Sequence, residues 1–201
     1  MDVEDAHNYL TDTCTVSELE SFLVLGGEPM LFPSRTFPII DRARELNIPR
    51  IEMLTNGVWG KSRRRAQELA SGLKRSGLND LGISVDAFHV QFIPLEYPRN
   101  AALASVRAGI EQVTWNVAVI ESLNGKNKYD RKTARMLKSL KPVGIETHVH
   151  RVIPVGRAAL NLRQYIKKES LNGPCMGDPI LENALTHPEC ITIEPSGEAN
   201  I

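Results

Sequence analysis

Residues 22–29 read Phe-Leu-Val-Leu-Gly-Gly-Glu-Pro, and this stretch decides how the rest of the chain is organised. The run of four apolar residues is typical of a buried strand. Gly26 and Gly27 end the strand, and glycine both adopts positive φ and lets a ligand approach the backbone closely. Glu28 and Pro29 follow, and proline is well tolerated at the first position of a helix. The stretch therefore predicts a tight turn and one carboxylate at the C-terminal edge of a sheet, where parallel α/β proteins bind their ligands.

The same stretch is equally compatible with an ordinary strand-to-helix turn, because diglycine turns are common. The segments that follow decide between the two interpretations. Further short apolar strands are predicted at 51–54, 81–86, 114–120 and 145–153. Amphipathic helical patterns occupy 2–13, 36–46, 62–73, 100–112 and 130–140. Strands that alternate with helices at this spacing predict βα units, and hence an α/β fold with a parallel sheet. We expect a partial (βα) barrel with helices outside and its first strand missing.

Composition limits the functions that this chain can have. The 201 residues suffice for one domain with a substantial core, and Lys plus Arg equals Asp plus Glu. Zero net charge argues against a general nucleic-acid binder, which is usually basic. No apolar run approaches the roughly 20 residues that a membrane span needs, and residues 1–5 lack the features of a signal peptide. We therefore expect a cytoplasmic protein that contacts neither nucleic acid nor membrane.

The chain contains three cysteines, Cys14, Cys175 and Cys190. An odd and sparse set does not make a disulfide framework. No two of them have CxxC spacing, so the sequence shows no self-evident zinc or iron–sulfur site, and we predict no metal ligands. His148 and His150 lie two apart on one predicted strand, a pattern that fits barrel-lining or solvent-facing side chains better than a metal site.

Polar residues follow the other predicted strands. Thr55-Asn56-Gly57 comes after residues 51–54, and Asn-Gly is a strong turn signal. Ser84 and Asp86 end the next strand, and their spacing of two predicts that both face one ligand. The long loop at 87–99 is expected to cover that site. His89 could reach the site from this loop, but a role in packing the loop is favoured.

In chain order, Gly-Gly-Glu-Pro, Thr-Asn-Gly, Ser-Val-Asp and Pro-x-Gly-Arg-Ala each follow a strand. This series resembles the radical S-adenosylmethionine (radical SAM) enzymes over roughly residues 15–160. We accordingly divide the chain into a partial-barrel core at 1–160 and the start of a C-terminal extension at 161–201. The extension, with Cys175 and the strand-like run at 190–198, resembles the beginning of a SPASM or twitch domain.

The resemblance implies contacts between the strand-end residues and S-adenosylmethionine. Residues 26–29 would lie along its methionine part, with backbone groups and Glu28 holding the ammonium. Ser84 and Asp86 would contact the ribose hydroxyls or the methionine carboxylate. The remaining implied contacts are Thr55 and Asn56 beside the mouth of the S-adenosylmethionine site, Asn116 at the ribose, and Val155 and Gly156 against the adenine.

The resemblance also implies cofactors and partners. In the family, S-adenosylmethionine binds a [4Fe–4S] cluster held by three cysteines, and its reductive cleavage yields a 5′-deoxyadenosyl radical. The implied partners are a small-molecule or peptide substrate and an electron donor such as ferredoxin or flavodoxin. The family's CxxxCxxC motif is absent from this sequence, and Cys14 follows the first predicted helix instead of preceding it. We therefore interpret the chain as a fragment: a truncated gene prediction, a true internal start or an engineered piece.

Three functions stay open at this point. The first is a radical SAM enzyme, or a piece of one that modifies a peptide or cofactor and is inactive alone. The second is a binding module that keeps the pocket for S-adenosylmethionine or another small molecule without a cluster. The third is an unrelated parallel α/β barrel enzyme, although no lysine is placed at a strand end for Schiff-base chemistry and no convincing phosphate loop is present.

Overall fold

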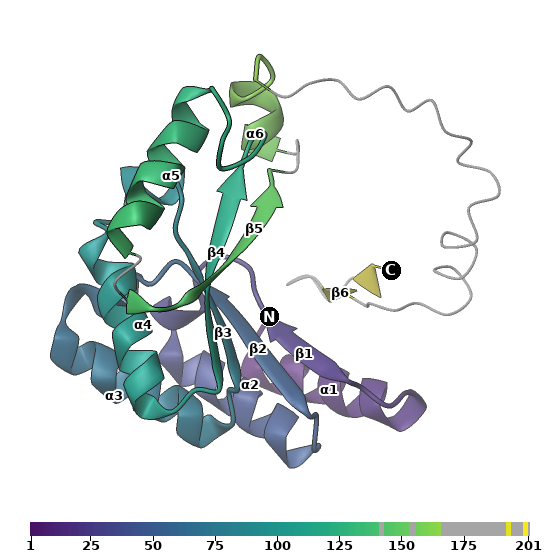
Figure 1. Cartoon of the computed structure of the whole chain (residues 1–201). Coiled ribbons are helices and arrows are strands. Elements are labelled where there is room, and N and C mark those ends of the chain that lie inside the picture. The colour runs from purple at the N-terminus through teal and green to yellow at the C-terminus, as the bar shows by residue number, and fades with distance from the viewer. Residues whose placement is uncertain (141–142, 153–155, 166–191, 194–198, 201) are drawn as a thin grey trace, which may run out of the picture.

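The computed structural model describes residues 1–140, 143–152, 156–165, 192–193 and 199–200. It confirms the predicted α/β fold, in which strands and helices alternate along the chain (Figure 1). The main sheet contains β1 (Ser21–Val24), β2 (Arg50–Thr55), β3 (Asp80–Ser84), β4 (Gln112–Val119) and β5 (Glu146–Arg151). A separate antiparallel pair joins β6 (Thr192–Ile193) to β7 (Ala199–Asn200). Most of the expected C-terminal extension, including Cys175 and Cys190, lies outside the described residues.

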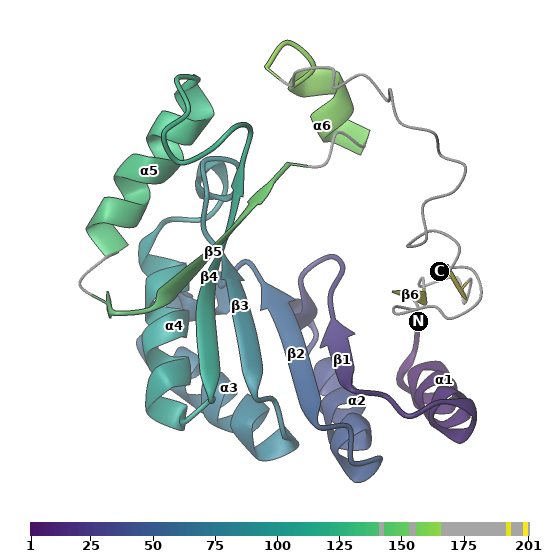
Figure 2. The same ribbon diagram turned by 45° about the vertical axis from the view of Figure 1, so that its right-hand side comes forward.

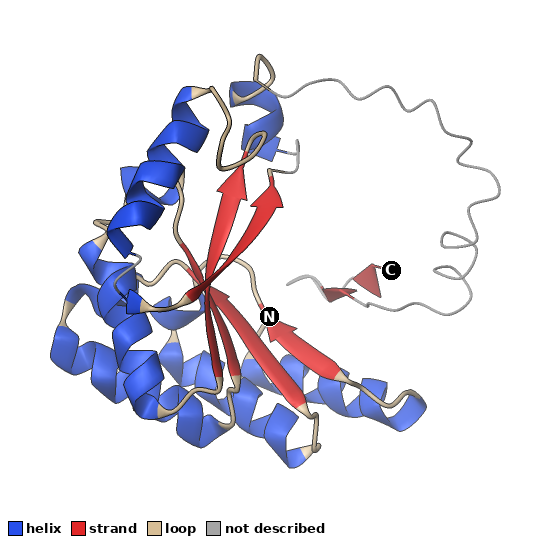
Figure 3. Cartoon of the chain, viewed as in Figure 1, coloured by secondary structure: helices blue, strands red, loops and turns tan. Residues whose placement is uncertain are grey.

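All strands of the main sheet are parallel and follow the order β1-β2-β3-β4-β5. The long helices are α1 (Val3–Val16), α2 (Pro33–Glu45), α3 (Arg63–Ser76), α4 (Glu96–Ala108) and α5 (Lys128–Leu140). Helices α2 to α5 lie on one face of the sheet, as the blue and red elements of Figure 3 and the turned view of Figure 2 show. The arrangement is an open sheet, which agrees with the predicted partial barrel.

The core lies between the sheet and these helices. Alternate strand residues such as Met53, Trp115 and Val117 are almost fully buried, and they belong to one hydrophobic cluster with Leu69 and Leu73 of α3. The residues between them, such as Asn116, are only half-buried because no described helix covers their face of the sheet. Within the described part of the chain, that face is left open.

Several element boundaries differ from the sequence prediction. Helix α1 continues to Val16, beyond the predicted end at residue 13. Helix α4 ends at Ala108, before the predicted 112, because Gly109 adopts a left-handed φ of 81°. A short 3-10 helix η3 (His89–Gln91) and the early start of α4 also occupy much of the predicted loop at 87–99. Within the described part of the chain, no helix combines the length and the apolarity that crossing a membrane requires.

Strand β1 is less buried than predicted. Leu23 is 39% exposed and Leu25, just beyond the strand, is 59% exposed, so the expectation of a fully buried strand is wrong. Phe22 and Val24 pack against the core, so Leu23 between them points to the face that no described helix covers. Among the described strands, β1 also pairs only with β2 and therefore forms one edge of the sheet. An unpaired apolar edge offers free N–H and C=O groups to another chain.

We predict that this edge drives self-association of the 201-residue chain. Substituting Leu23 with lysine should lower the associated fraction, because a charged side chain opposes edge-to-edge pairing. Sedimentation velocity over a concentration series measures the effect, with Leu160→Lys as a control on an exposed leucine outside the sheet. A wild-type chain that stays monomeric at all concentrations contradicts the prediction.

Candidate functional site

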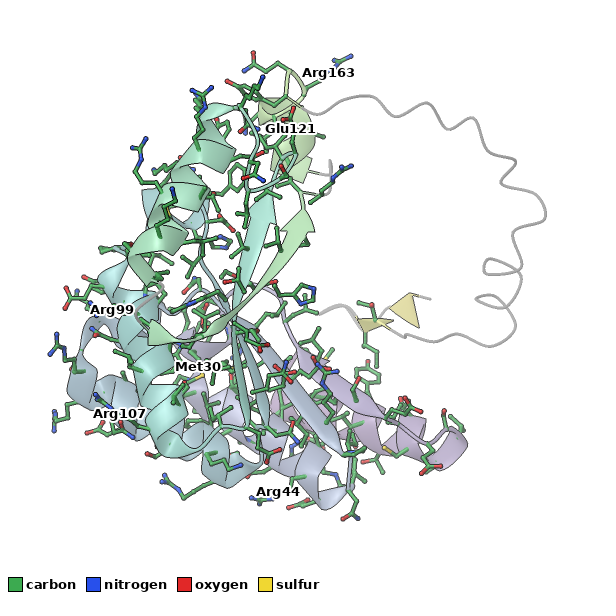
Figure 4. The ribbon with its side chains drawn as sticks, viewed as in Figure 1. Met30, Arg44, Arg99, Arg107, Glu121 and Arg163 are labelled. Carbon is green, nitrogen blue, oxygen red and sulfur yellow. The ribbon has the colours of Figure 1, made fainter. Side chains whose placement is uncertain are left out.

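Glu28 ties the loop after β1 to the loop after β2. Its side chain is 9% exposed, and three donors reach its carboxylate. Oε1 accepts from the Met30 N–H at 3.1 Å and from the Thr55 hydroxyl at 2.6 Å, while Oε2 accepts from the Asn56 N–H at 2.7 Å. Met30 follows in the short 3-10 helix η1 (Pro29–Leu31), where Pro29 occupies the predicted first turn (Figure 4). Among the described residues, Oε2 thus accepts a single hydrogen bond, although a carboxylate oxygen can accept two.

Thr55 organises the second loop. Its hydroxyl donates to Glu28 and accepts from the Gly57 N–H at 3.1 Å and from Trp59 Nε1 at 3.0 Å. Asn56 directs its side chain back onto the Val58 N–H at 2.9 Å. The hydrogen-bonding capacity of Thr55 is used within the protein, so this residue shapes the mouth of the site and holds Glu28 in place.

Gly26 and Gly27 lie at the exposed end of β1. Both adopt positive φ, 97° and 58°, as the sequence predicted. A side chain built at either position would meet no atom within 4 Å, so the glycines are required by backbone conformation and not by crowding. The open space above them leaves their peptide groups accessible beside Glu28.

Ser84 and Asn116 are brought together by the sheet register. Ser84 pairs with Asn116, and Asn116 pairs with His148 of β5, so the three residues form one row across adjacent strands. Directly paired residues share a face of a sheet, and the half-burial of Ser84 and Asn116 places the row on the face without helices. This row gives the site a polar floor.

The structure places Asp86 just beyond the C-terminal end of β3. Strand β3 ends at Ser84, so the two-residue periodicity that placed Ser84 and Asp86 together does not extend to Asp86. The Asp86 carboxylate is 1% exposed and accepts from the N–H groups of Phe88, His89 and Ala118 at 2.9, 3.1 and 3.2 Å. It also faces Nδ1 of His89 at 2.9 Å. Asp86 therefore joins the loop after β3 to strand β4.

Asp86 and His89 shift each other's pKa. Burial acts to raise the pKa of Asp86, but the hydrogen bond and positive charge of His89, together with backbone N–H groups, outweigh it and lower that pKa. Burial acts to lower the pKa of His89, but the hydrogen bond and charge of Asp86 and the charge of Glu28 raise it overall. Both shifts favour the charged pair.

These shifts predict a pH dependence of stability. The contribution of His89 is complete below its ordinary pKa of 6.5 and is lost as pH rises through its raised folded-state pKa. The contribution of Asp86 is present above 3.8 and is lost as pH falls through its lowered folded-state pKa. Denaturant unfolding should therefore show stability falling above pH 6.5, and His89→Gln should flatten that fall. Identical pH profiles for the two proteins would refute the assignment.

Asp130 is a structural anchor that the sequence analysis missed. Its carboxylate is fully buried and accepts from the N–H groups of residues 120–122 at 2.8, 2.9 and 3.2 Å and from Asn127 Nδ2 at 2.7 Å. Asn127 caps α5 by accepting from the Tyr129 and Asp130 N–H groups. An asparagine three residues before an acidic residue at a helix start is a recognisable capping pattern, and this was the available signal.

The structure describes only some of the remaining predicted residues, and they do not all lie at the candidate site. Gly156 begins the short helix α6 (Gly156–Asn161) after β5, while Val155 lies outside the described residues. Cys14 lines a cavity with Asn47 and Pro49, which precede β2, so it lies at the N-terminal edge of the sheet and not at the candidate site. Among the described residues, no group of three His, Cys, Asp or Glu side chains has the arrangement of a metal site.

No protein-family model and no curated protein matches this sequence significantly. Among solved structures, the chain is similar to coproporphyrinogen III oxidase (HemN) from Escherichia coli, described as a radical SAM enzyme. The TM-score is 0.58 at 13% sequence identity, and the match covers 91% of this chain and 44% of HemN. This chain therefore spans less than half the length of HemN. At that identity the similarity establishes a shared fold, the open parallel α/β sheet described above.

Proposed function

We propose that this chain is the S-adenosylmethionine-binding part of a radical SAM-type enzyme. The observation that carries the proposal is the convergence of the loops after β1 and β2 on one buried carboxylate, Glu28, at the C-terminal edge of the sheet. Ligands of parallel α/β folds bind at that edge. The fold shared with HemN adds support, because it places this edge in a sheet of the same kind.

The residues around Glu28 suit the methionine end of S-adenosylmethionine. The free acceptor position on Oε2 matches an ammonium donor, and a charge-assisted bond of this kind is stronger than a neutral one. The peptide groups of Gly26 and Gly27 lie in open space beside it. Ser84 and Asn116 offer hydroxyl and amide groups to the ribose. Val155 and Gly156 stay candidates for the adenine contact.

The described residues do not fit a [4Fe–4S] cluster. Such a cluster needs cysteine thiolates, and the part of the chain that the structure describes offers only Cys14, at the opposite edge of the sheet. We therefore assign no catalytic step to this chain. A small-molecule or peptide substrate and an electron donor such as ferredoxin or flavodoxin belong to the proposed complete enzyme.

The chain alone is expected to lack radical activity. After anaerobic incubation with iron, sulfide and a strong reductant, the purified protein should release no 5′-deoxyadenosine from S-adenosylmethionine. Chromatography of the quenched mixture measures that product, with an active radical SAM enzyme as the positive control. Product above the protein-free background would contradict the expectation.

A second candidate is a binding module that holds S-adenosylmethionine without a cluster. The lack of a metal-site arrangement among the described residues favours it. The two candidates share the binding site but differ in whether the native polypeptide also carries cluster-binding cysteines. Their presence would support the radical SAM enzyme. The intact mass and cysteine peptides of the protein isolated from its source cells decide between them.

A further inference from the structure

Asp86 is a rigid acceptor at the mouth of the candidate site. Three backbone N–H groups fix its carboxylate, two from its own loop and one from Ala118 in β4. Together with Nδ1 of His89 these donors occupy both oxygens, and the side chain is 1% exposed. Asp86 therefore has little capacity left for a ligand, but it can hold the ring of His89 in one orientation.

His89 has one engaged and one free ring nitrogen. Nδ1 lies 2.9 Å from both Asp86 oxygens, and an ionised carboxylate only accepts hydrogen bonds, so Nδ1 carries a proton. Within the described residues, Nε2 has no hydrogen-bond partner, and the His89 side chain is 40% exposed. When the ring is protonated, Nε2 is an accessible cationic donor.

Glu28 and His89 lie above the ends of adjacent strands. Thr55 and Asn56 hold the Glu28 carboxylate at the end of β2, and β2 pairs with β3, whose following loop carries His89. Among the described residues, the charged groups that influence the titration of His89 are Asp86, on its own loop, and Glu28, on the loop after β1. The mouth thus presents an acceptor, Glu28 Oε2 at the end of β2, and a donor, His89 Nε2 on the loop after the adjacent strand β3. An α-amino acid carries its ammonium and carboxylate on the same carbon, so groups that bind both must lie close together.

We propose that His89 Nε2–H binds the carboxylate of the ligand's α-amino-acid head, while Glu28 takes the ammonium. Asp86 is the positioning residue that orients His89 and does not touch the ligand. This inference rests on the proposed function, since S-adenosylmethionine is the ligand with that head group. In this proposal Asp86 does not itself contact the methionine carboxylate, because the two negative charges would repel each other.

Calorimetry with two probes tests the inference. S-adenosylmethionine carries the carboxylate, whereas decarboxylated S-adenosylmethionine keeps the amine and lacks it. At about pH 6, where His89 is protonated, His89→Gln should weaken binding of the first probe about tenfold or more. Binding of the second probe should be unchanged. His7→Gln, on α1 where His7 contacts Pro38, is the control histidine and should match the wild type for both probes.

The pH dependence of binding distinguishes a His89 that binds the ligand carboxylate from a His89 that only stabilises the fold. Wild-type affinity for S-adenosylmethionine should fall as pH rises through the pKa of His89. Affinity for the decarboxylated probe should not fall over that pH range for this reason, because the probe has no carboxylate. Asp86→Asn should move the fall to lower pH, because it removes the charge that holds the proton on His89. The wild-type profile alone tests the inference if that variant does not fold.

Two results would overturn the inference. If the wild type binds S-adenosylmethionine and His89→Gln binds it equally well, or loses affinity for both probes alike, His89 does not bind the carboxylate and the proposed function stands. If the wild type binds neither probe at any pH, the proposed function fails and the inference fails with it.

Discussion

Replacing Asp130 with alanine is expected to lower the free energy of unfolding by about 3–5 kcal/mol, because it leaves buried donors without their charged partner. Four donors converge on this carboxylate, three from the backbone after β4 and one from Asn127. A typical domain has a total stability of about 5–15 kcal/mol, so this one change is expected to bring the chain near its folding limit.

Chemical denaturation followed by circular dichroism measures the loss. Glu121→Ala is the matched control, because Glu121 is an exposed acid in the same loop whose side chain makes no hydrogen bond or ion pair among the described residues (Figure 4). It should change stability by no more than about 0.5 kcal/mol. Equal effects of the two substitutions would show that Asp130 does not anchor the loop.

Replacing Glu28 with alanine is expected to cost about 3 kcal/mol of stability and to abolish measurable S-adenosylmethionine binding. The substitution frees the Met30 and Asn56 N–H groups and the Thr55 hydroxyl, so the loops after β1 and β2 lose their link. It also removes the proposed ammonium acceptor. Denaturation and calorimetry on the same preparation measure the two effects.

Glu20→Ala is the control for this prediction. Glu20 is an exposed acid that immediately precedes β1, at the opposite end of the strand from Glu28. It should retain both stability and binding. If Glu28→Ala keeps wild-type affinity, the buried carboxylate is structural only and the ammonium site lies elsewhere.

The sequence predicted those features of the fold that depend on local patterns. The apolar runs at 51–54 and 114–120 and the helical patterns between strands were sufficient for a parallel α/β sheet. The turn residues Gly26 and Gly27 had the predicted positive φ, because that conformation is a property of glycine itself. Local patterns carry such information because each depends on neighbouring residues only.

Features that depend on distant contacts were not predicted. The exposure of Leu23 follows from the face of the sheet on which it lies and from the edge position of β1, and both are properties of the whole sheet. The role of Asp86 follows from the Ala118 N–H, 32 residues away, and that of Glu28 from Thr55, 27 residues away. Strand periodicity placed Asp86 beside Ser84, but side-chain capping of the loop replaced the strand there.

The most direct test of the central claim is an amide NMR titration of the ¹⁵N-labelled chain with S-adenosylmethionine. We expect saturable shifts at Gly26, Gly27, Asn56 and His89, which surround the mouth at the C-terminal edge of the sheet, and none at Cys14 or Asn47 at the other edge. No shifts, or shifts confined to the N-terminal edge, would contradict it.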